Sequence, residues 1–380
     1  MSAFRSAGPH LLTLLLVSAV AAVARAQATK DYGDVTRATT VTLKFDKAPQ
    51  KDVFDQLARQ AGQEFVTQPK DLWTASPGAP ISIDLKDQPF WVAMKEACGK
   101  AGISLKYATD TANPQVVLCR DNQDWTKYPT LASGPFLVSL IGLERQSIVD
   151  MRKPNDAQRT FFARFSVFCE PRFRLLRGSL SAKVEQAVDD KGNSLVPKEA
   201  AADARLNFVT SWVYPIQANL EYPKDGAAAA GTRITTLRAS ARFVAQTKSQ
   251  TIEIPDPLTA RNVTRDVAGR KIVLKELRRT TEQYEATVSF ARGESIPREQ
   301  WENTTFPGNA LRLVDADGKT IFSHAFGLGG RSDESTYVFK FPREAPGVSR
   351  IGKPVKLIWE IPTQTTDLPL TFEFKDLPVP

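Results

Sequence analysis

Few residues in this chain have the types and spacing that catalysis or metal binding requires. The sequence holds two histidines and three cysteines among 380 residues, and His324 is the only histidine after residue 26. A metal site needs several clustered ligands, and a serine triad needs a base held beside its nucleophile. His324 has neither kind of neighbour in the sequence, so we predict no metal site, no cofactor and no histidine-based hydrolase.

One compact cluster combines acids with an aromatic ring, where Glu299 and Glu302 stand on either side of Trp301. Two carboxylates placed across a sugar can hydrolyse a glycosidic bond. Charged residues around a single tryptophan more often belong to an amphipathic loop that covers a core. We therefore predict a protein that is not an enzyme, and a polysaccharide-active enzyme is the second alternative.

Two Asp-rich turns resemble the start of a calcium loop, at Asp189–Gly192 and Asp315–Gly318. A calcium loop also needs further spaced oxygen ligands and a closing glutamate. Lys191 interrupts the first turn, and Lys319 follows the second where a ligand should stand. Asp-Gly between two strands is a strong hairpin signal, so we predict hairpins here.

The three cysteines are Cys98, Cys119 and Cys169. Cys98 falls in a helical pattern and Cys119 in the strand-like run that follows it, so these two could form a disulfide. A bridge closing a loop of this length would add about 3 kcal/mol of stability. The alternative is two small buried thiols, and the sequence leaves both open. Cys169 belongs to an apolar alternation and is expected in a core.

The chain begins with the features of a secretory signal over residues 1–26. Arg5 supplies the basic start, Leu11–Val23 is apolar but too short to span a bilayer, and Ala24–Ala26 has the small-x-small form of a cleavage site. No later stretch reaches 18 consecutive apolar residues, so no transmembrane segment is expected after signal removal. We predict an exported protein, periplasmic or extracellular.

Charge excludes one class of partner. Without residues 1–26 the chain carries 48 basic and 42 acidic residues, a mixed balance of +6. A nucleic-acid binder concentrates basic residues on one element or face, so we predict no nucleic-acid partner. The group Arg172, Arg174 and Arg177 could contact an anionic envelope polymer, but its alternation favours the solvated face of a strand.

A strand–helix pattern occurs twice at a spacing of forty residues. Val41–Pro49 (VTLKFDKAP) recurs as Ile81–Pro89 (ISIDLKDQP), and each is followed by a helical apolar stripe that ends in Ala-Gly, at Gly62 and Gly102. Proline suits the first turn of each helix, where its missing N–H costs nothing. We predict a small α+β domain over residues 39–120, with two helices on one side of a small sheet and a shared core.

These two units resemble the short N-terminal (STN) domain of secretins and TonB-dependent receptors, in which a strand and turn of the form VTLDFKDAP lead into a helix and a second such unit follows. The resemblance implies an interaction platform of the bacterial envelope. It covers about eighty residues at packing positions. No secretin pore or outer-membrane barrel follows, so the usual partner of that family does not transfer. The layout as a whole resembles exported bacterial proteins without an assigned activity.

Beyond about residue 130 the periodicity becomes that of strands. Two pairs of segments look alike: Val184–Pro197 with Leu311–Ser323, and Arg233–Pro257 with Lys353–Pro378. Alternating strands separated by turns are typical of sandwiches. We predict two tandem β-sandwiches, residues 130–257 and 262–380, and a single large sandwich is the alternative. The fold class is thus a small α+β domain followed by a mainly β region.

The expected function is docking. We predict a non-catalytic envelope protein whose small domain and sandwiches contact an envelope protein or a cell-wall polymer, with strand addition at a sheet edge as one mode. Phe90 and Trp91, at the start of the second helix, are the candidate interaction surface. A carbohydrate-binding sandwich protein is the first alternative, because tryptophans at loop edges could stack on sugars, although such residues are more often buried. These are Trp73, Trp125, Trp212 and Trp301.

Overall fold

The computed structural model describes residues 29–106, 116–120, 125–155, 157–198, 206–209, 211–221, 231–294, 296–297, 301, 311–331, 334–343 and 351–380, with the backbone alone for 324–331. In these residues the chain is mainly β with a small α+β region at its N-terminal end, as the sequence predicted. The signal-like residues 1–26, the acids Glu299 and Glu302, and the side chain of His324 lie outside the described parts.

The α+β region, which we call the N-terminal module, contains the duplicated pattern that the sequence predicted. Strand β2 (Thr40–Ala48) leads into helix α1 (Gln50–Ala61), and strand β4 (Ile81–Pro89) leads into helix α3 (Phe90–Ala101). Both helices end at a left-handed glycine, with φ of 62° at Gly62 and 60° at Gly102. Side chains other than glycine rarely adopt this conformation, which explains why each unit stops at that residue.

The strands of this module form two sheets, whereas the sequence predicted one. β2 pairs antiparallel with β4, and a separate sheet has the order β3 (Phe65–Gln68), β6 (Val116–Cys119), β5 (Ser104–Lys106). A short helix, α2 (Leu72–Ala75), follows β3. The two units share one core, as predicted, because apolar residues of both helices and both long strands fall in one buried cluster.

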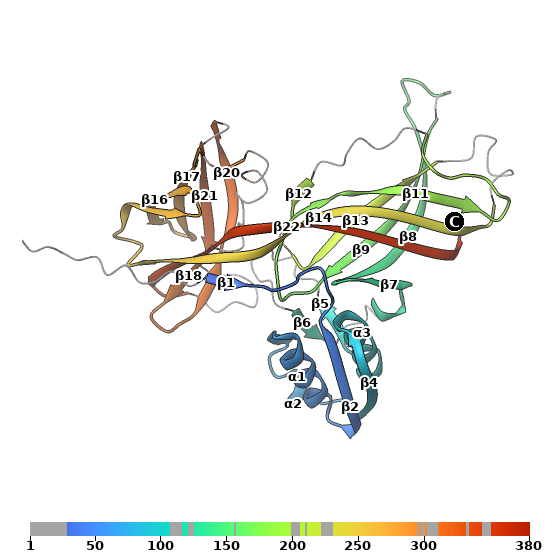
Figure 1. The fold of residues 1–380 in the computed structure, drawn as a ribbon, viewed down its shortest axis with the longest axis horizontal. Coiled ribbons are helices and arrows are strands. Elements are labelled where there is room, and N and C mark those ends of the chain that lie inside the picture. Colours follow the sequence, from blue (N-terminus) through green and yellow to red (C-terminus); the bar gives the residue numbers. More distant parts are fainter. Residues whose placement is uncertain are drawn as a thin grey trace, which may run out of the picture.

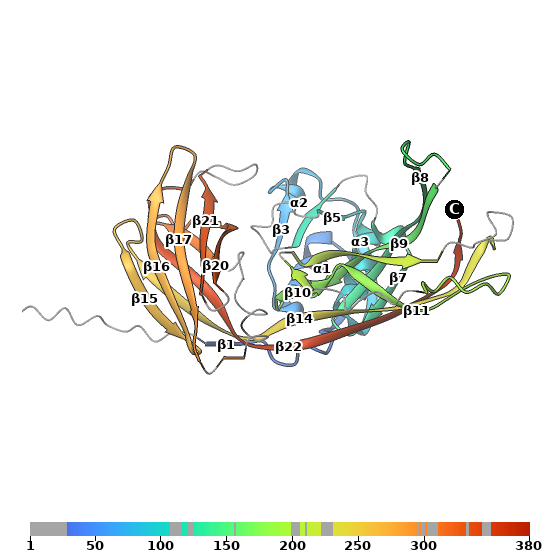
Figure 2. The same cartoon turned by 90° about the horizontal axis from the view of Figure 1, so that it is seen from above.

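Two exceptionally long strands connect the rest of the molecule. β14 (Arg233–Pro255) and β22 (Pro354–Pro378) pair antiparallel along their whole lengths, and Figures 1 and 2 show this ribbon passing through both β regions. A strand of 25 residues is about 80 Å long, well beyond the span of one sandwich. Each strand therefore contributes to two cores.

The first β region is a strongly curled sheet. Its strands have the order β22–β14–β11–β13–β9–β8–β7, and β7 returns to lie against β22. Their bounds are β7 (Thr130–Ser133), β8 (Phe136–Val149), β9 (Ala157–Cys169), β11 (Ser181–Asp189) and β13 (Val213–Leu220). Three further strands pair with this sheet outside that order: β1 (Thr29–Asp31), β10 (Leu175–Ser179) and β12 (Leu206–Phe208). The apolar faces of these strands enclose the largest core of the molecule.

The second β region packs two sheets against each other. One has the order β15–β16–β17–β21–β20, and the other consists of β19 and β18 beside the remaining parts of β22 and β14. The bounds are β15 (Arg261–Val267), β16 (Arg270–Arg279), β17 (Gln283–Arg292), β18 (Leu311–Asp315), β19 (Thr320–Phe322), β20 (His324–Arg331) and β21 (Glu334–Pro342). Trp301 and Trp359 are buried in the core between these sheets.

The predicted boundaries of the two β regions need correction. The last part of the chain, from Leu368 to Leu377, packs in the core of the first region, although the sequence placed it in the second. Ile252 and Ile254 lie at the end of β14 and pack in the core of the second region. The look-alike segments Arg233–Pro257 and Lys353–Pro378 are thus partner strands of one ribbon, so the two β regions are not independent tandem units.

The two Asp-rich turns are hairpin turns stabilised in the same way. Asp189 accepts N–H groups of its own turn, and its second oxygen accepts the N–H of Gly231 at 2.8 Å. Asp315 likewise accepts N–H groups of its turn and the N–H of Gly352 at 2.8 Å. Each glycine lies two residues before one of the long strands. These carboxylates therefore hold the hairpins to the ribbon, which confirms the hairpin interpretation.

Candidate functional site

The predicted interaction surface at the start of α3 is buried, so its expected exposure was wrong. Phe90 is fully buried, and Trp91 is 2% exposed. The indole of Trp91 stacks on that of Trp212 with 5.5 Å between ring centroids, and Phe168 lies at the same distance. Trp125 completes the group by packing on Phe168 at 5.3 Å. We call Trp91, Trp125, Phe168 and Trp212 the aromatic seam.

The aromatic seam joins the N-terminal module to the first β region. Its rings belong to the same buried cluster as the interior of the module, so one continuous core crosses the boundary. Trp91 lies off the stripe that faces its own domain, and the sequence pattern therefore favoured exposure. In the folded chain that second face of the helix meets the neighbouring sheet.

Most of the tryptophans that the sequence offered as sugar platforms are also buried. Trp125, Trp212 and Trp301 are at most 6% exposed, and Trp73 is partly covered by stacking on Phe54. The buried alternative is thus confirmed for these three residues. A carbohydrate site built from exposed tryptophan rings has no support at these positions.

The cysteines do not form the suggested bridge. Cys98 and Cys119 are reduced and buried, with Cys98 Sγ 3.8 Å from the sulfur of Met94 and Cys119 Sγ 3.6 Å from the carbonyl oxygen of Ser104. The alternative of small buried thiols therefore describes them. Cys169 lies in the core of the first β region, as expected, and burial raises the pKa of its thiol.

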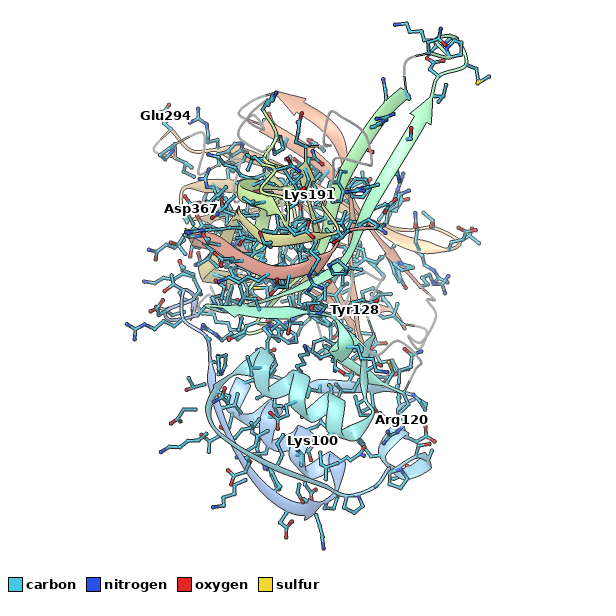
Figure 3. The ribbon with its side chains drawn as sticks, turned by 90° about the vertical axis from the view of Figure 1, so that its right-hand side faces the viewer. Lys100, Arg120, Tyr128, Lys191, Glu294 and Asp367 are labelled. Atoms are coloured by element: carbon cyan, nitrogen blue, oxygen red, sulfur yellow. The ribbon has the colours of Figure 1, made fainter. Side chains whose placement is uncertain are left out.

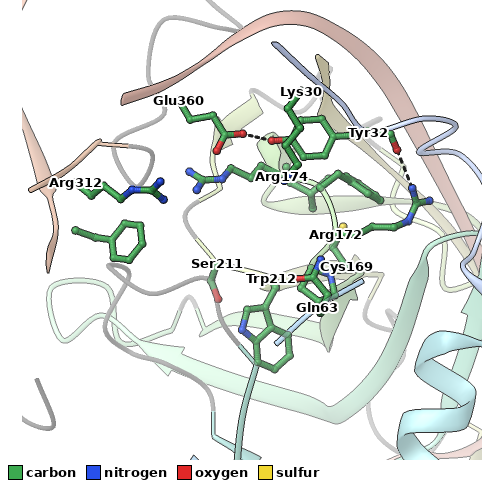
Figure 4. A pocket seen from close by; sticks show the side chains of 14 residues that line it. Lys30, Tyr32, Gln63, Cys169, Arg172, Arg174, Ser211, Trp212, Arg312 and Glu360 are labelled. Atoms are coloured by element: carbon green, nitrogen blue, oxygen red, sulfur yellow. Dashed lines mark hydrogen bonds between the residues drawn. The ribbon is translucent and has the colours of Figure 1, made fainter. Parts of the chain in front are cut away.

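A cavity lies where the N-terminal part of the chain and the two β regions meet. We call it the junction cavity; its volume is about 230 Å³. Residues from the N-terminal segment, from the first β region and from the second β region line it (Figure 4). The polar and aromatic lining residues are Lys30, Tyr32, Gln63, Arg172, Phe173, Arg174, Ser211, Trp212, Arg312, Phe322 and Glu360.

A hydrogen-bond network surrounds the carboxylate on one side of this cavity. The hydroxyl of Tyr32 donates to Glu360, and Ser249 and Gln246 donate to the same oxygen at 2.9 and 3.0 Å. Burial acts to raise the pKa of Glu360, but the charge of Arg174 and the hydrogen bonds from Tyr32 and Ser249 outweigh it, so the pKa lies below its usual range. Glu360 is therefore an ionised acceptor and is unsuited to act as a general acid.

Arg172 fixes the segment that leads from β1 to the N-terminal module. We call residues 29–38 the N-terminal strap. The guanidinium of Arg172 donates to three strap carbonyls, those of Tyr32, Asp34 and Arg37, at 2.7 to 3.1 Å. It also pairs with Glu170 at 2.7 Å, and Glu170 is only 2% exposed. This arginine positions the strap and the wall of the cavity.

Positive charge exceeds negative charge in the cavity wall. Four described lining residues are basic, Lys30, Arg172, Arg174 and Arg312; the acids that balance them are Glu360 in the wall and Glu170, which pairs with Arg172. In Figure 4 the side chains of Arg174 and Arg312 reach into the same space from opposite sides. Two facing guanidinium groups in a partly buried space attract an anion strongly, because water screens them less than at an open surface.

Only part of this site can be recognised in the sequence. Arg172 and Arg174 belong to the arginine group that could contact an anionic polymer, although their alternation favours a solvated strand face. Tyr32, Arg312 and Glu360 are far apart in the chain and carry no local motif. Arg177, the third member of the group, lies away from the cavity and stacks on Phe208, with its guanidinium carbon 4.0 Å from the ring centre.

Metal ligands do not gather in the parts of the chain that the structure describes: these contain no grouping of three or more histidine, cysteine, aspartate or glutamate side chains suited to an ion. Nor does any helix among the described residues have the length and apolarity to cross a membrane. No protein-family model, no curated protein and no solved structure matches this chain.

Proposed function

We propose that this chain is a non-catalytic, exported protein of the cell envelope that binds its partner by receiving a negatively charged group in the junction cavity. The observation that carries the proposal is the composition of the cavity wall, in which cations from the N-terminal strap and from both β regions surround one space. The resemblance of residues 39–120 to the short N-terminal domain of secretins and TonB-dependent receptors supports an envelope role.

The chemistry of the wall favours binding over catalysis. Glu360 is ionised and already accepts three hydrogen bonds, so it balances charge and shapes the wall. Arg174 and Arg312 provide planar donor groups suited to a carboxylate or a phosphate. Trp212 and Phe322 add apolar surface beside them. Such a wall suits an acidic unit of a cell-wall polymer or an acidic side chain of an envelope protein.

The size of the cavity limits what can enter. A volume of about 230 Å³ accommodates a single acidic side chain or one charged sugar unit, and a folded domain would remain outside. The partner would thus present an exposed anionic group, while the surrounding surface supplies further contacts. Binding of this kind should weaken as ionic strength rises.

Crosslinking in intact cells tests this proposal. The wild type is compared with the double variant Arg174→Gln, Arg312→Gln and with Arg238→Gln, a control that removes a half-exposed arginine paired with Glu185 outside the cavity. Hydrogen bonds to charged groups contribute roughly 1.5–3 kcal/mol each, so the double variant should bind at least about tenfold more weakly. Equal recovery of partner by all three proteins would refute the role of the cavity.

The same three proteins distinguish the two kinds of partner. Purified cell-wall material should sediment the wild type and the control if an acidic polymer is bound. Specific crosslinks to one protein, with no sedimentation, would identify a protein partner. Turnover of a polymer by the wild type would contradict the non-catalytic proposal itself.

A further inference from the structure

A second feature projects from the body of the molecule, away from the junction cavity. β8 and β9 pair along their full lengths, and their outer ends extend beyond the sheet as a hairpin, seen at the upper right of Figures 2 and 3. Residues 146–149 and 157–160 are all exposed, so this part contributes nothing to the core. We call residues 146–160 the hairpin tip, of which residue 156 is outside the described chain.

Large apolar side chains are concentrated at the hairpin tip. Ile148 is 57% exposed, Val149 45% and Met151 83%. Six large hydrophobic side chains of the described chain are at least 39% exposed, and three of these six lie within the four positions 148–151. Single exposed apolar residues are ordinary, but a cluster at the end of a projection indicates a contact surface.

The arrangement of these residues favours one kind of contact. Ile148 and Val149 are neighbours in a strand and therefore point to opposite faces of the hairpin, while Met151 lies in the turn. A flat partner surface would cover only one face. A fluid apolar medium covers both faces and the turn at once, and the border region of a lipid bilayer is such a medium.

The charges around the tip are nearly balanced and leave one lysine beside the apolar turn. Between residues 144 and 159 the sequence has four basic and three acidic residues, a net charge of +1. Asp150 pairs with Arg152 at 2.7 Å, and Glu144 pairs with Arg164 on the body of β9 at 2.8 Å. Lys153 stands next to the apolar turn, where its long side chain can reach lipid phosphates while the tip enters the bilayer.

We infer that the hairpin tip inserts into the surface of a bilayer containing anionic phospholipids and holds the protein against the membrane. The three side chains enter the acyl border, and the basic residues contact the headgroups. With this small apolar area the attachment is reversible, unlike that of a spanning helix. This inference is independent of the junction cavity, because it concerns a different surface and a different ligand.

Vesicle sedimentation of the mature chain tests the inference. The probe is vesicles of phosphatidylglycerol and phosphatidylethanolamine, with phosphatidylcholine vesicles for comparison. The wild type should bind the anionic vesicles, and the triple variant Ile148→Ser, Val149→Ser, Met151→Ser should bind at least about tenfold more weakly, since each apolar side chain contributes on the order of 1 kcal/mol. Leu180→Ser is the matched control, because Leu180 is 52% exposed on the body.

Each result has a defined meaning. Loss of binding in the triple variant alone supports insertion of the tip, provided its unfolding midpoint equals that of the wild type. Absence of wild-type binding to anionic vesicles, or equal binding by the triple variant, overturns the inference. Crosslinks from the tip to a protein, without vesicle binding, would reassign the tip to a protein partner.

Discussion

Two of the contacts between the N-terminal part of the chain and the β regions have opposite character. At the aromatic seam, Trp91 and Trp212 stack within a core that runs from the N-terminal module into the first β region. At the junction cavity, the N-terminal strap is held by Arg172 and by the hydroxyl of Tyr32. The first contact is apolar and filled, and the second is charged and leaves an open space.

This difference suggests that the aromatic seam holds the module in place and that the junction cavity binds a partner. Burial of the aromatic rings does not depend directly on pH or salt concentration, since none of the four seam side chains titrates. The charged contact depends on the ionisation of Glu360 and places more basic than acidic side chains around a cavity. A protein that needed only a rigid joint could use the seam alone, so the polar contact is the better candidate for function.

The largest expected effect is at the seam. Trp91→Ala should lower the free energy of unfolding by about 3–5 kcal/mol, because it leaves a cavity between two parts of the protein. Chemical denaturation measures this. Trp91→Phe keeps a ring in place and should lose clearly less, and Phe208→Ala, at a side chain 42% exposed, is the control. A loss below 1 kcal/mol for Trp91→Ala would show that the seam does not hold the two parts together.

The strap contact should be the next most sensitive. Arg172→Ala leaves the buried charge of Glu170 without its cation and removes the donor of three carbonyls, so it should lower the free energy of unfolding by roughly 2–4 kcal/mol. Arg172→Lys should recover little of this stability, because an ammonium group cannot reproduce the planar set of donors of a guanidinium. Proteolysis within residues 33–38 should accelerate in both variants. Unchanged cleavage would indicate that the strap is held by other contacts.

Acid should weaken the cavity contact and leave the seam unaffected. The pKa of Glu360 is lower in the folded chain than the ordinary value, so its stabilising contribution is complete above the unfolded pKa of about 4.3 and is lost as pH falls through the folded pKa. Glu360→Gln should therefore flatten the decline of stability between about pH 5 and pH 2.

Asp315→Asn is the comparison for that experiment. The carboxylate of Asp315 accepts the N–H of Gly352 and N–H groups of its own turn, and these hydrogen bonds lower its pKa. The hairpin that contains Asp315 lies away from the strap. Both substitutions should flatten the acid decline, but only Glu360→Gln should change the rate of strap cleavage. The idea of a separate polar contact fails if the two variants respond alike.

The smallest effect is expected at the exposed surface of the ribbon. Arg242 on β14 pairs with Asp367 on β22 at 2.9 Å, and both side chains are about half exposed. Water screens this pair, so Arg242→Ala should change the free energy of unfolding by no more than about 1 kcal/mol. Denaturation at low and high salt checks this, and a loss as large as that of Arg172→Ala would contradict the contrast between buried and exposed pairs.

Local patterns were the most reliable guide to this fold. The proline and glycine that bound each helix predicted α1 and α3 at their observed positions, and the Asp-rich turns predicted the two hairpins. The candidate site was predicted only in part: Arg172 and Arg174 attracted notice as a group, whereas Tyr32 and Glu360, 328 positions apart, carry no shared motif. Trp91 was predicted to be exposed, because the apolar period of a helix shows only the face that packs on its own domain. It does not show whether the opposite face packs on a second one.

The sequence by itself determined the elements whose causes are local: the period of apolar residues, proline at helix starts, and glycine where the backbone must turn left-handed. Only the tertiary structure decided which elements meet. The pairing of β14 with β22, the aromatic seam and the cluster of cations around the junction cavity all join residues that are distant in the chain. Such contacts are selected by the burial and charge balance of the whole folded molecule, and no short stretch of sequence contains that information.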